Sequence, residues 1–167
     1  KTAVGSGIVS SFFTIDDYWA EGQSSTENWR EIDFEAIGNI SNAIQTNIIT
    51  AYETHHEEMI YTPFYPYSDF HVYVFEWTPQ SIKFFVDGQL VRENYDDYVS
   101  TLNTGQKIMM NIWQPIWESW VGAFDASILP VYAYYDWVKY YSYSPGEGAY
   151  GSFNNFSFEW EDNFDSF

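Results

Sequence analysis

The sequence predicts an all-β domain, either a sandwich or a barrel. Three observations favour this class. Apolar runs are short, turn-forming residues separate them at fairly regular intervals, and no stretch repeats with the period of a helix. Aromatic residues, which favour strands, make up 22% of the chain. With 167 residues, 46% of them hydrophobic, the chain is long enough for one domain with a substantial core.

The expected strands are spread over the whole chain and are separated by polar, Gly-containing or Pro-containing segments. They cover residues 8–15, 29–37, 42–50, 70–77, 82–86, 89–91, 108–113, 131–141 and 156–160. The polar segment 16–28 is expected to be a surface loop in which Tyr18 and Trp19 are packed anchors, with rim contacts to a ligand as the alternative. Asp87-Gly88, between two apolar runs, predicts a two-residue hairpin turn.

Two further segments are expected to lie outside strands. Residues 51–68 are irregular and contain the adjacent histidines His55 and His56. Neighbouring side chains of an extended chain point in opposite directions, so the two make a poor metal pair, and we interpret them as surface residues. The Pro- and Gly-containing residues 144–152 are expected to be a flexible connector. Residues 1–167 are therefore interpreted as a single domain.

The most informative stretch is the alternation of acids with apolar residues in the second predicted strand. On a strand, Glu31, Asp33 and Glu35 project from one face, while Ile32 and Phe34 project from the other. Three like charges along one face repel one another, and a merely solvated strand usually mixes in other polar residues. The row is therefore a candidate site, with an acidic solvent-facing strand as the alternative.

Glycoside hydrolysis by a retaining enzyme uses two carboxyl groups with different pKa values. One carboxylate attacks the sugar, and the other carboxyl group transfers protons. The Cα atoms of Glu31 and Glu35 are expected about 13 Å apart on a strand. A retaining enzyme needs ~5–5.5 Å between the carboxyl groups. Long side chains that lean inward on a concave strand close most of this gap, so the spacing permits catalysis without requiring it.

Charge and composition narrow the class of partner. The chain carries 24 acidic and 6 basic side chains, a formal charge of -18. This charge argues against nucleic acids, anionic membranes and polyanionic polysaccharides. No apolar run approaches the ~20 residues of a membrane span. A neutral sugar polymer is favoured, because aromatic rings stack on sugars and acids and amides bind their hydroxyl groups.

Other candidate ligand contacts are polar or aromatic residues on neighbouring strands. Gln45 and Asn47 share one face of the third strand, where amides suit sugar hydroxyls and a solvated face is the alternative. Trp113, Trp117 and Trp120 lie among polar neighbours and are interpreted as a partly open aromatic wall. His71 is interpreted as a hydrogen-bonded sheet residue.

These residues together resemble glycoside hydrolase family 16, and the closest resemblance is to its 1,3-1,4-β-glucanases (lichenases). The resemblance runs in order over nearly the whole chain. It rests on Gly7-Ile8-Val9-Ser10-Ser11-Phe12-Phe13, Trp29-x-Glu31-x-Asp33-x-Glu35, Gln45-Thr46-Asn47, Phe70-His71-x-Tyr73, Val86-Asp87-Gly88, Asn111-Ile112-Trp113 and Tyr135-Asp136-Trp137-Val138-Lys139. It implies a β-jelly-roll sandwich of two antiparallel sheets with a concave substrate cleft.

The resemblance also implies roles for individual residues. Glu31 would be the nucleophile, Asp33 the assisting carboxylate and Glu35 the acid/base. Residues that match positions lining the glucan cleft are Phe13, Trp29, Gln45, Asn47, Asn111, Trp113 and Trp120. Lichenases often carry an aromatic residue at the position of Ile15, so one stacking contact differs here.

The end of the chain resembles the beginning of ordinary family members. The stretch 160–165 looks like their N-terminal strand, although it follows their C-terminal strand here, as in naturally circularly permuted lichenases. Connector 144–152 would then join the former C- and N-terminal strands. By this resemblance the domain is expected to be incomplete, and a companion segment or second chain is expected to complete it. Asp136 matches a ligand of a structural Ca²⁺, with Asn163 as a second ligand.

The expected function is therefore endo-acting, retaining hydrolysis of mixed-linkage 1,3-1,4-β-D-glucan, without a cofactor for catalysis. A secreted location is expected, although no signal segment is visible in this chain. One alternative is a xyloglucan-active hydrolase or transglycosylase of the same family. A second is a glycan-binding module without catalysis, and a third is an inactive fragment.

Overall fold

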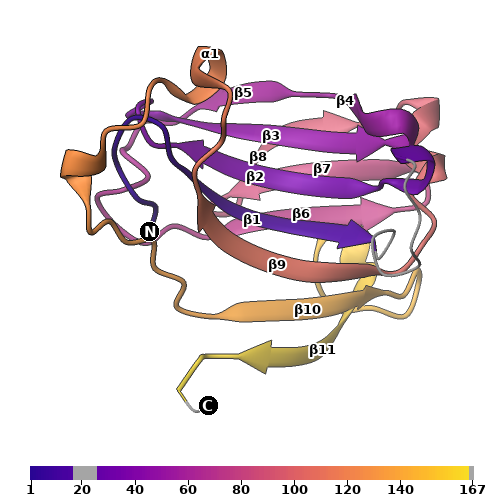
Figure 1. The fold of residues 1–167 in the computed structure, drawn as a ribbon. Helices are drawn as coiled ribbons and strands as arrows, with labels where there is room; N and C mark the ends of the chain where they lie inside the picture. Colours follow the sequence, from indigo (N-terminus) through magenta and orange to yellow (C-terminus); the bar gives the residue numbers. More distant parts are fainter. Residues whose placement is uncertain (17–25, 166–167) are drawn as a thin grey trace.

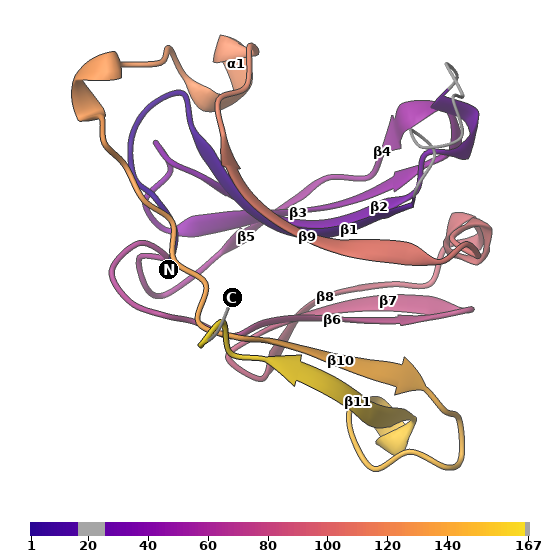
Figure 2. The same ribbon diagram turned by 60° about the horizontal axis from the view of Figure 1, so that its bottom comes forward.

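The computed structural model describes residues 1–16 and 26–165, which form two antiparallel sheets packed face to face and a separate two-stranded hairpin (Figure 1). The predicted all-β jelly-roll sandwich is confirmed. The larger sheet has the order β4-β3-β2-β1-β9, with β5 also paired to β3. Figure 2 shows the larger sheet above, the smaller sheet β6-β7-β8 below it, and the hairpin β10-β11 lowest.

The bounds of the strands and helices are as follows. The larger sheet contains β1 (Val9–Asp16), β2 (Glu31–Ile37), β3 (Ala43–Thr50), β4 (Thr54–His55), β5 (Glu58–Tyr61) and β9 (Gln106–Trp113). The other strands are β6 (Tyr73–Thr78), β7 (Ser81–Val86), β8 (Gln89–Asn94), β10 (Val138–Tyr143) and β11 (Phe156–Asp162). The helical elements are η1 (Thr26–Asn28), η2 (Ala51–Glu53), η3 (Asp97–Thr101), α1 (Glu118–Val121), η4 (Ala126–Ile128) and η5 (Ser152–Asn154). No helix of the described residues is long and apolar enough to cross a membrane.

Each predicted strand overlaps an observed one, with two corrections. The segment 51–68, expected to be irregular, contains β4 and β5, which are too short to show a period in sequence. The predicted strand 131–141 begins its ladder only at Val138. The residues before Val138 cross toward the hairpin, and the Tyr135 hydroxyl lies 2.8 Å and 2.9 Å from the main-chain oxygens of Ser11 and Asn111.

The two predicted connections can be compared with the structure directly. Asp87 and Gly88 have φ values of 49° and 78°, which makes the β7–β8 connection the tight hairpin that the sequence predicts. The segment after β10 is a hydrogen-bonded turn, in which the Ser144 amide donates to the Asn155 carbonyl oxygen at 2.7 Å. Tyr18 and Trp19, predicted as loop anchors, lie outside the described residues.

The core forms where β2 and β3 face the smaller sheet. Ile32 and Phe34 of β2 are almost completely buried, and the ring of Phe34 packs edge-on against Phe84 of β7 at 5.3 Å between centroids. Ile44 and Ile48 of β3 belong to the same cluster. The alternation in β2 therefore directs its apolar residues into the sandwich and its acids to the opposite face.

A buried cation joins the two sheets. Arg92 of β8 donates hydrogen bonds to the Thr46 carbonyl oxygen at 3.1 Å, to the Thr46 hydroxyl at 2.9 Å and to the His56 carbonyl oxygen at 2.7 Å. Its guanidinium stacks over Phe84 and lies 3.3 Å from the carboxylate of Glu58, which is exposed. The hydrogen bonds to β3 and to the residue after β4 fix the smaller sheet against the larger one.

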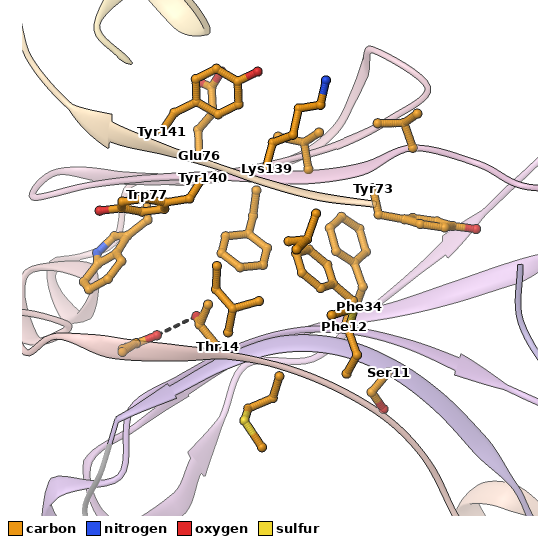
Figure 3. Close-up of a pocket in the computed structure, with 18 of the residues that line it drawn as sticks. Ser11, Phe12, Thr14, Phe34, Tyr73, Glu76, Trp77, Lys139, Tyr140 and Tyr141 are labelled. Atoms are coloured by element: carbon orange, nitrogen blue, oxygen red, sulfur yellow. Dashed lines mark hydrogen bonds between the residues drawn. The ribbon is translucent and has the colours of Figure 1, made fainter. Parts of the chain in front are cut away.

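A large apolar cavity separates the larger sheet from the hairpin. Its volume is about 1620 Å³. Figure 3 shows Phe12 and Phe34 on the side of the larger sheet, with Trp77 of β6 and Tyr140 of β10 on the other side. Tyr140 and its cross-strand partner Trp160 are about 40% exposed there, so the aromatic inner face of the hairpin is only partly covered.

The role of Arg92 gives a stability prediction. Arg92→Ala leaves the buried oxygens of Thr46 and His56 without their donor, so we expect the free energy of unfolding to fall by about 2–5 kcal/mol. Glu58→Gln should change it by less than ~1 kcal/mol, because that carboxylate is exposed. Urea unfolding followed by circular dichroism measures both. Equal effects of the two substitutions would contradict the assigned role.

Candidate active site

The acidic row lies in the middle of the larger sheet, on the face turned away from the core. In the register, Glu31, Asp33 and Glu35 of β2 are opposite Ile15, Phe13 and Ser11 of β1 and opposite Ile49, Asn47 and Gln45 of β3. Directly opposed residues of an antiparallel pair share a face. We call this surface the triad face, and we call the three acids the triad. Figure 2 shows α1 rising above this sheet at one end and the β4 region at the other.

Burial raises the pKa values of all three acids of the triad, and repulsion by the other acids adds to the increase for Asp33 and Glu35. Asp33 is 3% exposed, and burial raises its pKa well above the usual range, with further increases from the charges of Glu31 and Glu35. Burial, followed by the charges of Glu31 and Glu57, raises the pKa of Glu35 to about 8. Asp33 and Glu35 therefore keep their protons at a pH where an ordinary carboxyl group is ionised.

Glu31 differs because its carboxylate receives hydrogen bonds. Burial raises its pKa, but hydrogen bonds from Asp33 and from the Trp29 indole oppose this effect. The Trp29 Nε1–H donates to Glu31 Oε2 at 2.6 Å. Since two carboxylates cannot share a hydrogen bond without a proton, Asp33 supplies that proton and Glu31 is the ionised partner. The environments thus divide the triad into an ionised Glu31 and a protonated Glu35.

Glu35 is held from β3 by an amide whose orientation is fixed. An indole N–H can only donate, so the Gln45 atom that lies 2.9 Å from Trp120 Nε1 is its oxygen. Gln45 Nε2 then donates to Glu35 Oε2 at 3.4 Å. Gln45 is 5% exposed, so it acts as a bridge from α1 to Glu35.

The predicted aromatic wall forms at the end of the triad face next to Glu35. The ring of Trp113 packs at 5.9 Å from Trp120 and at 6.5 Å from Trp117. Trp113 and Trp120 cover a small cluster that includes Val9 and Val121, whereas Trp117 is 56% exposed. The wall therefore combines two packed rings with one ring open to a ligand.

The remaining predicted contacts are also placed on the triad face. Phe13 is opposite Asp33 and Asn111 is opposite Ser11 in the register, so both share the face of the triad. Asn47 is opposite Asp33 but only 2% exposed. Its amide oxygen accepts from the His56 main-chain N–H at 3.0 Å, and its amide nitrogen lies 3.0 Å from His55 Nδ1.

His55 is a residue of this face that the sequence reasoning missed. It pairs with Ile49 at the edge of the sheet, in the cross-strand row that contains Glu31. Its ring lies edge-on to Trp29 at 6.5 Å between centroids. The two-residue strand that places it is too short to show a period, so in the sequence His55 is only one of two adjacent histidines in a polar segment.

Asp136 and Asn163 lie away from the triad face. The pairing of Val138 with Asp162 brings both to the same end of the β10–β11 hairpin. Ca²⁺ takes about six to eight oxygen ligands, and the described residues contain no cluster of three or more His, Cys, Asp or Glu residues that could hold a metal. The residues present thus do not make a complete calcium site, and the predicted ion stays a prediction.

Comparison with known proteins identifies the family of the chain. The family model "Glycosyl hydrolases family 16" matches residues 1–139. The chain is 39% identical to a β-glucanase of Fibrobacter succinogenes over 173 aligned residues, which cover 100% of this chain and 48% of that protein. It is 38% identical to a β-glucanase of Bacillus subtilis, with 84% of this chain and 54% of that protein covered.

Solved structures of β-glucanases have a fold similar to that of this chain. A β-1,3-1,4-glucanase (lichenase) derived from a mouse hindgut metagenome is 38% identical, with a TM-score of 0.64, and the match covers 75% of this chain and 55% of that one. The chain spans about half the length of the curated relatives described above.

The raised pKa of Glu35 predicts that the substitution Glu35→Gln changes stability by an amount that depends on pH. Between the ordinary value of 4.5 and the folded value of about 8, the folded state binds more protons than the unfolded state, so stability falls as pH rises. Glu35→Gln cannot ionise and avoids this loss. We expect equal melting temperatures for Glu35→Gln and the parent near pH 4 and a higher one for Glu35→Gln at pH 8–9. Glu147→Gln, in an exposed turn, is the control, and a gap independent of pH would contradict the burial of Glu35.

Proposed function

The chain belongs to glycoside hydrolase family 16, and from this membership we propose that it acts as an endo-acting, retaining β-glucanase on mixed-linkage 1,3-1,4-β-D-glucan. The observation that carries the proposal is the division of the triad into an ionised Glu31 and a protonated Glu35 on one face of one strand. Retaining hydrolysis needs these two states at the start of the reaction. The printed names of its relatives, β-glucanase and lichenase, support the substrate class.

The proposed reaction has two steps. First, the Glu31 carboxylate attacks the anomeric carbon, the glycosidic C–O bond breaks, and Glu35 gives its proton to the leaving oxygen. Second, the Glu35 carboxylate takes a proton from water while the water oxygen attacks the anomeric carbon and releases Glu31. Two inversions at one carbon retain its configuration. No cofactor is required for either step.

Neighbouring residues hold the two glutamates in these roles. Trp29 and Asp33 donate to Glu31 and favour its ionised form. Gln45 orients Glu35 through a hydrogen bond that is itself fixed by Trp120. We propose that Phe13, Trp29, Asn111 and Trp113 contact the glucan on the same face. Asn47, with its oxygen already bonded, has an amide hydrogen left for a sugar hydroxyl.

The alternatives differ in substrate or in turnover. A xyloglucan-active hydrolase or transglycosylase would use the same triad, and Ile15 beside Glu31 is a position where substrate preference can differ. A binding module without catalysis would have no use for a buried, high-pKa Glu35. We also propose a secreted protein, since a polysaccharide substrate does not cross membranes.

We further propose that a companion polypeptide segment covers the cavity above the hairpin, and that the chain is circularly permuted. The partly exposed, aromatic inner face of β10–β11 and the cavity of about 1620 Å³ support a polypeptide occupant. The family model ends at residue 139, whereas the alignment with the Fibrobacter protein covers the whole chain, including β11. A structural Ca²⁺ bound by Asp136 and Asn163 would need its other ligands from that segment.

The glucanase proposal predicts the fate of two triad variants. Glu35→Gln should reduce kcat on mixed-linkage glucan by about 10²–10⁴-fold, the usual contribution of a general acid. Glu31→Gln should reduce it at least as much. The activity of the parent should fall at alkaline pH as Glu35 ionises around pH 8. Oligosaccharide analysis of a barley-type glucan digest measures turnover and linkage together.

Parallel digests distinguish the alternatives. Products from xyloglucan but not from mixed-linkage glucan would favour the xyloglucan-active enzyme. Binding of glucan without products, both by the chain alone and by its complex with the companion segment, would favour the binding module. Products from the complex alone would show that the chain by itself is an inactive fragment. Unchanged turnover in Glu31→Gln would show that another residue is the nucleophile.

The companion-segment proposal predicts complementation. The probe is a polypeptide carrying the part of the Fibrobacter β-glucanase that this chain does not span. We expect a one-to-one complex by light scattering and a blue shift of Trp fluorescence as Trp160 is buried. Tyr140→Asp, within the cavity, should prevent complex formation, whereas Phe153→Asp, on a residue 87% exposed elsewhere, should not. Self-association of the chain, or no complex, would overturn the proposal.

A further inference from the structure

We propose that His55 is a positioning residue for the glucanase reaction: its neutral imidazole holds the Asn47 amide in place for sugar binding, and protonation of the ring releases it. The inference rests on the proposed function, since the sugar is the ligand that Asn47 would meet. It concerns a residue outside the triad that belongs to the edge strand β4.

The fold brings His55 to the triad face from the edge of the sheet. Strand β4 folds back on β3 so that His55 is opposite Ile49, and Ile49 is opposite Glu31. Two residues along β3 from Ile49, on the same face, Asn47 is opposite Asp33. His55 therefore lies in the row of the nucleophile and next to the amide that faces the assisting acid.

The hydrogen bonds fix which atoms of the pair donate and accept. A main-chain N–H can only donate, so the Asn47 atom 3.0 Å from the His56 nitrogen is its oxygen. The other end of the amide is then the NH₂ group, which can only donate. It lies 3.0 Å from His55 Nδ1, so Nδ1 must offer a lone pair. His55 is therefore the neutral tautomer with its proton on Nε2.

Protonation would remove this acceptor. An imidazolium ring carries hydrogens on both nitrogens, so Nδ1 could no longer accept from Asn47. Glu57 Oε1 lies 3.7 Å from Nδ1 and Glu53 Oε1 lies 4.0 Å from Nε2, and both carboxylates are exposed and ready to receive the new donors. On protonation, His55 Nδ1 would thus lose its hydrogen bond with the Asn47 amide and donate to the Glu57 carboxylate instead.

The two other titratable groups near His55, Glu31 and His56, respond differently when the His55 ring becomes charged. Among the described residues, Glu31 also faces the ring, and a charged His55 would favour the ionised form of Glu31. His56 follows in the chain, and its own charge would oppose that of His55. The nucleophile is therefore not impaired by protonation of His55, and the expected loss falls on substrate binding through Asn47.

Two substitutions separate these effects. In His55→Asn, the side-chain oxygen takes the place of Nδ1 and accepts from Asn47 at every pH. In His55→Leu, no acceptor remains. We expect the KM of the parent for mixed-linkage glucan to rise at acidic pH, that of His55→Asn to stay level, and that of His55→Leu to be raised at all pH values by about 3–10-fold, the effect of one neutral hydrogen bond. The kcat values should be nearly unchanged.

A matched control and an activity-independent measurement complete the test. His71→Asn alters a histidine bound to Asp87 near the smaller sheet and should not affect the KM profile. The ¹⁵N NMR signals of the His55 ring in the 167-residue chain should show an unprotonated Nδ1 at neutral pH. A protonated Nδ1, or a KM of His55→Leu equal to that of the parent, would overturn the inference while leaving the glucanase proposal intact. A correct tautomer without glucan turnover, in the chain alone and in its complex with the companion segment, would instead contradict the proposed function.

Discussion

The alternation of β2 is the constraint on which the rest of the structure depends. Ile32 and Phe34 are buried in the sandwich, and the period of a strand then sends every intervening residue to the opposite face. A register slip of one residue would place three acids in the core and two large apolar side chains outside. The burial of Ile32 and Phe34 therefore stabilises the sandwich and also places the three acids of the triad on one face.

Three acids on one face of a strand repel one another when they are ionised, and their surroundings affect the ionisation of each acid differently. Asp33 is buried and keeps its proton, Glu31 receives hydrogen bonds, and Glu35 is raised to a pKa of about 8. The repulsion is relieved by protonation rather than by basic partners, in agreement with the scarcity of Lys and Arg in the chain. The unequal surroundings thus leave Glu31 ionised and Glu35 protonated.

The amides of β3 connect this site to the rest of the fold. Gln45 joins Glu35 to Trp120 of α1, and Asn47 joins the edge strand through His56 and His55. Arg92 donates to the His56 carbonyl oxygen from the core side. A chain of hydrogen bonds therefore runs from the buried guanidinium between the sheets to the residue beside Asp33, so packing of the sandwich and order at the triad face are physically linked.

The sequence by itself determined the all-β class, the Asp87-Gly88 hairpin and the common face of Glu31, Asp33 and Glu35, because these depend on local periodicity and turn chemistry. It also placed Gln45 and Asn47 on one face of β3. Only the tertiary structure decided that these amides are buried connectors, that β4 brings His55 to the triad face, and that residues 131–137 lie outside any strand. Those outcomes depend on which elements meet across the sheet, and contacts between distant segments leave no period in the sequence.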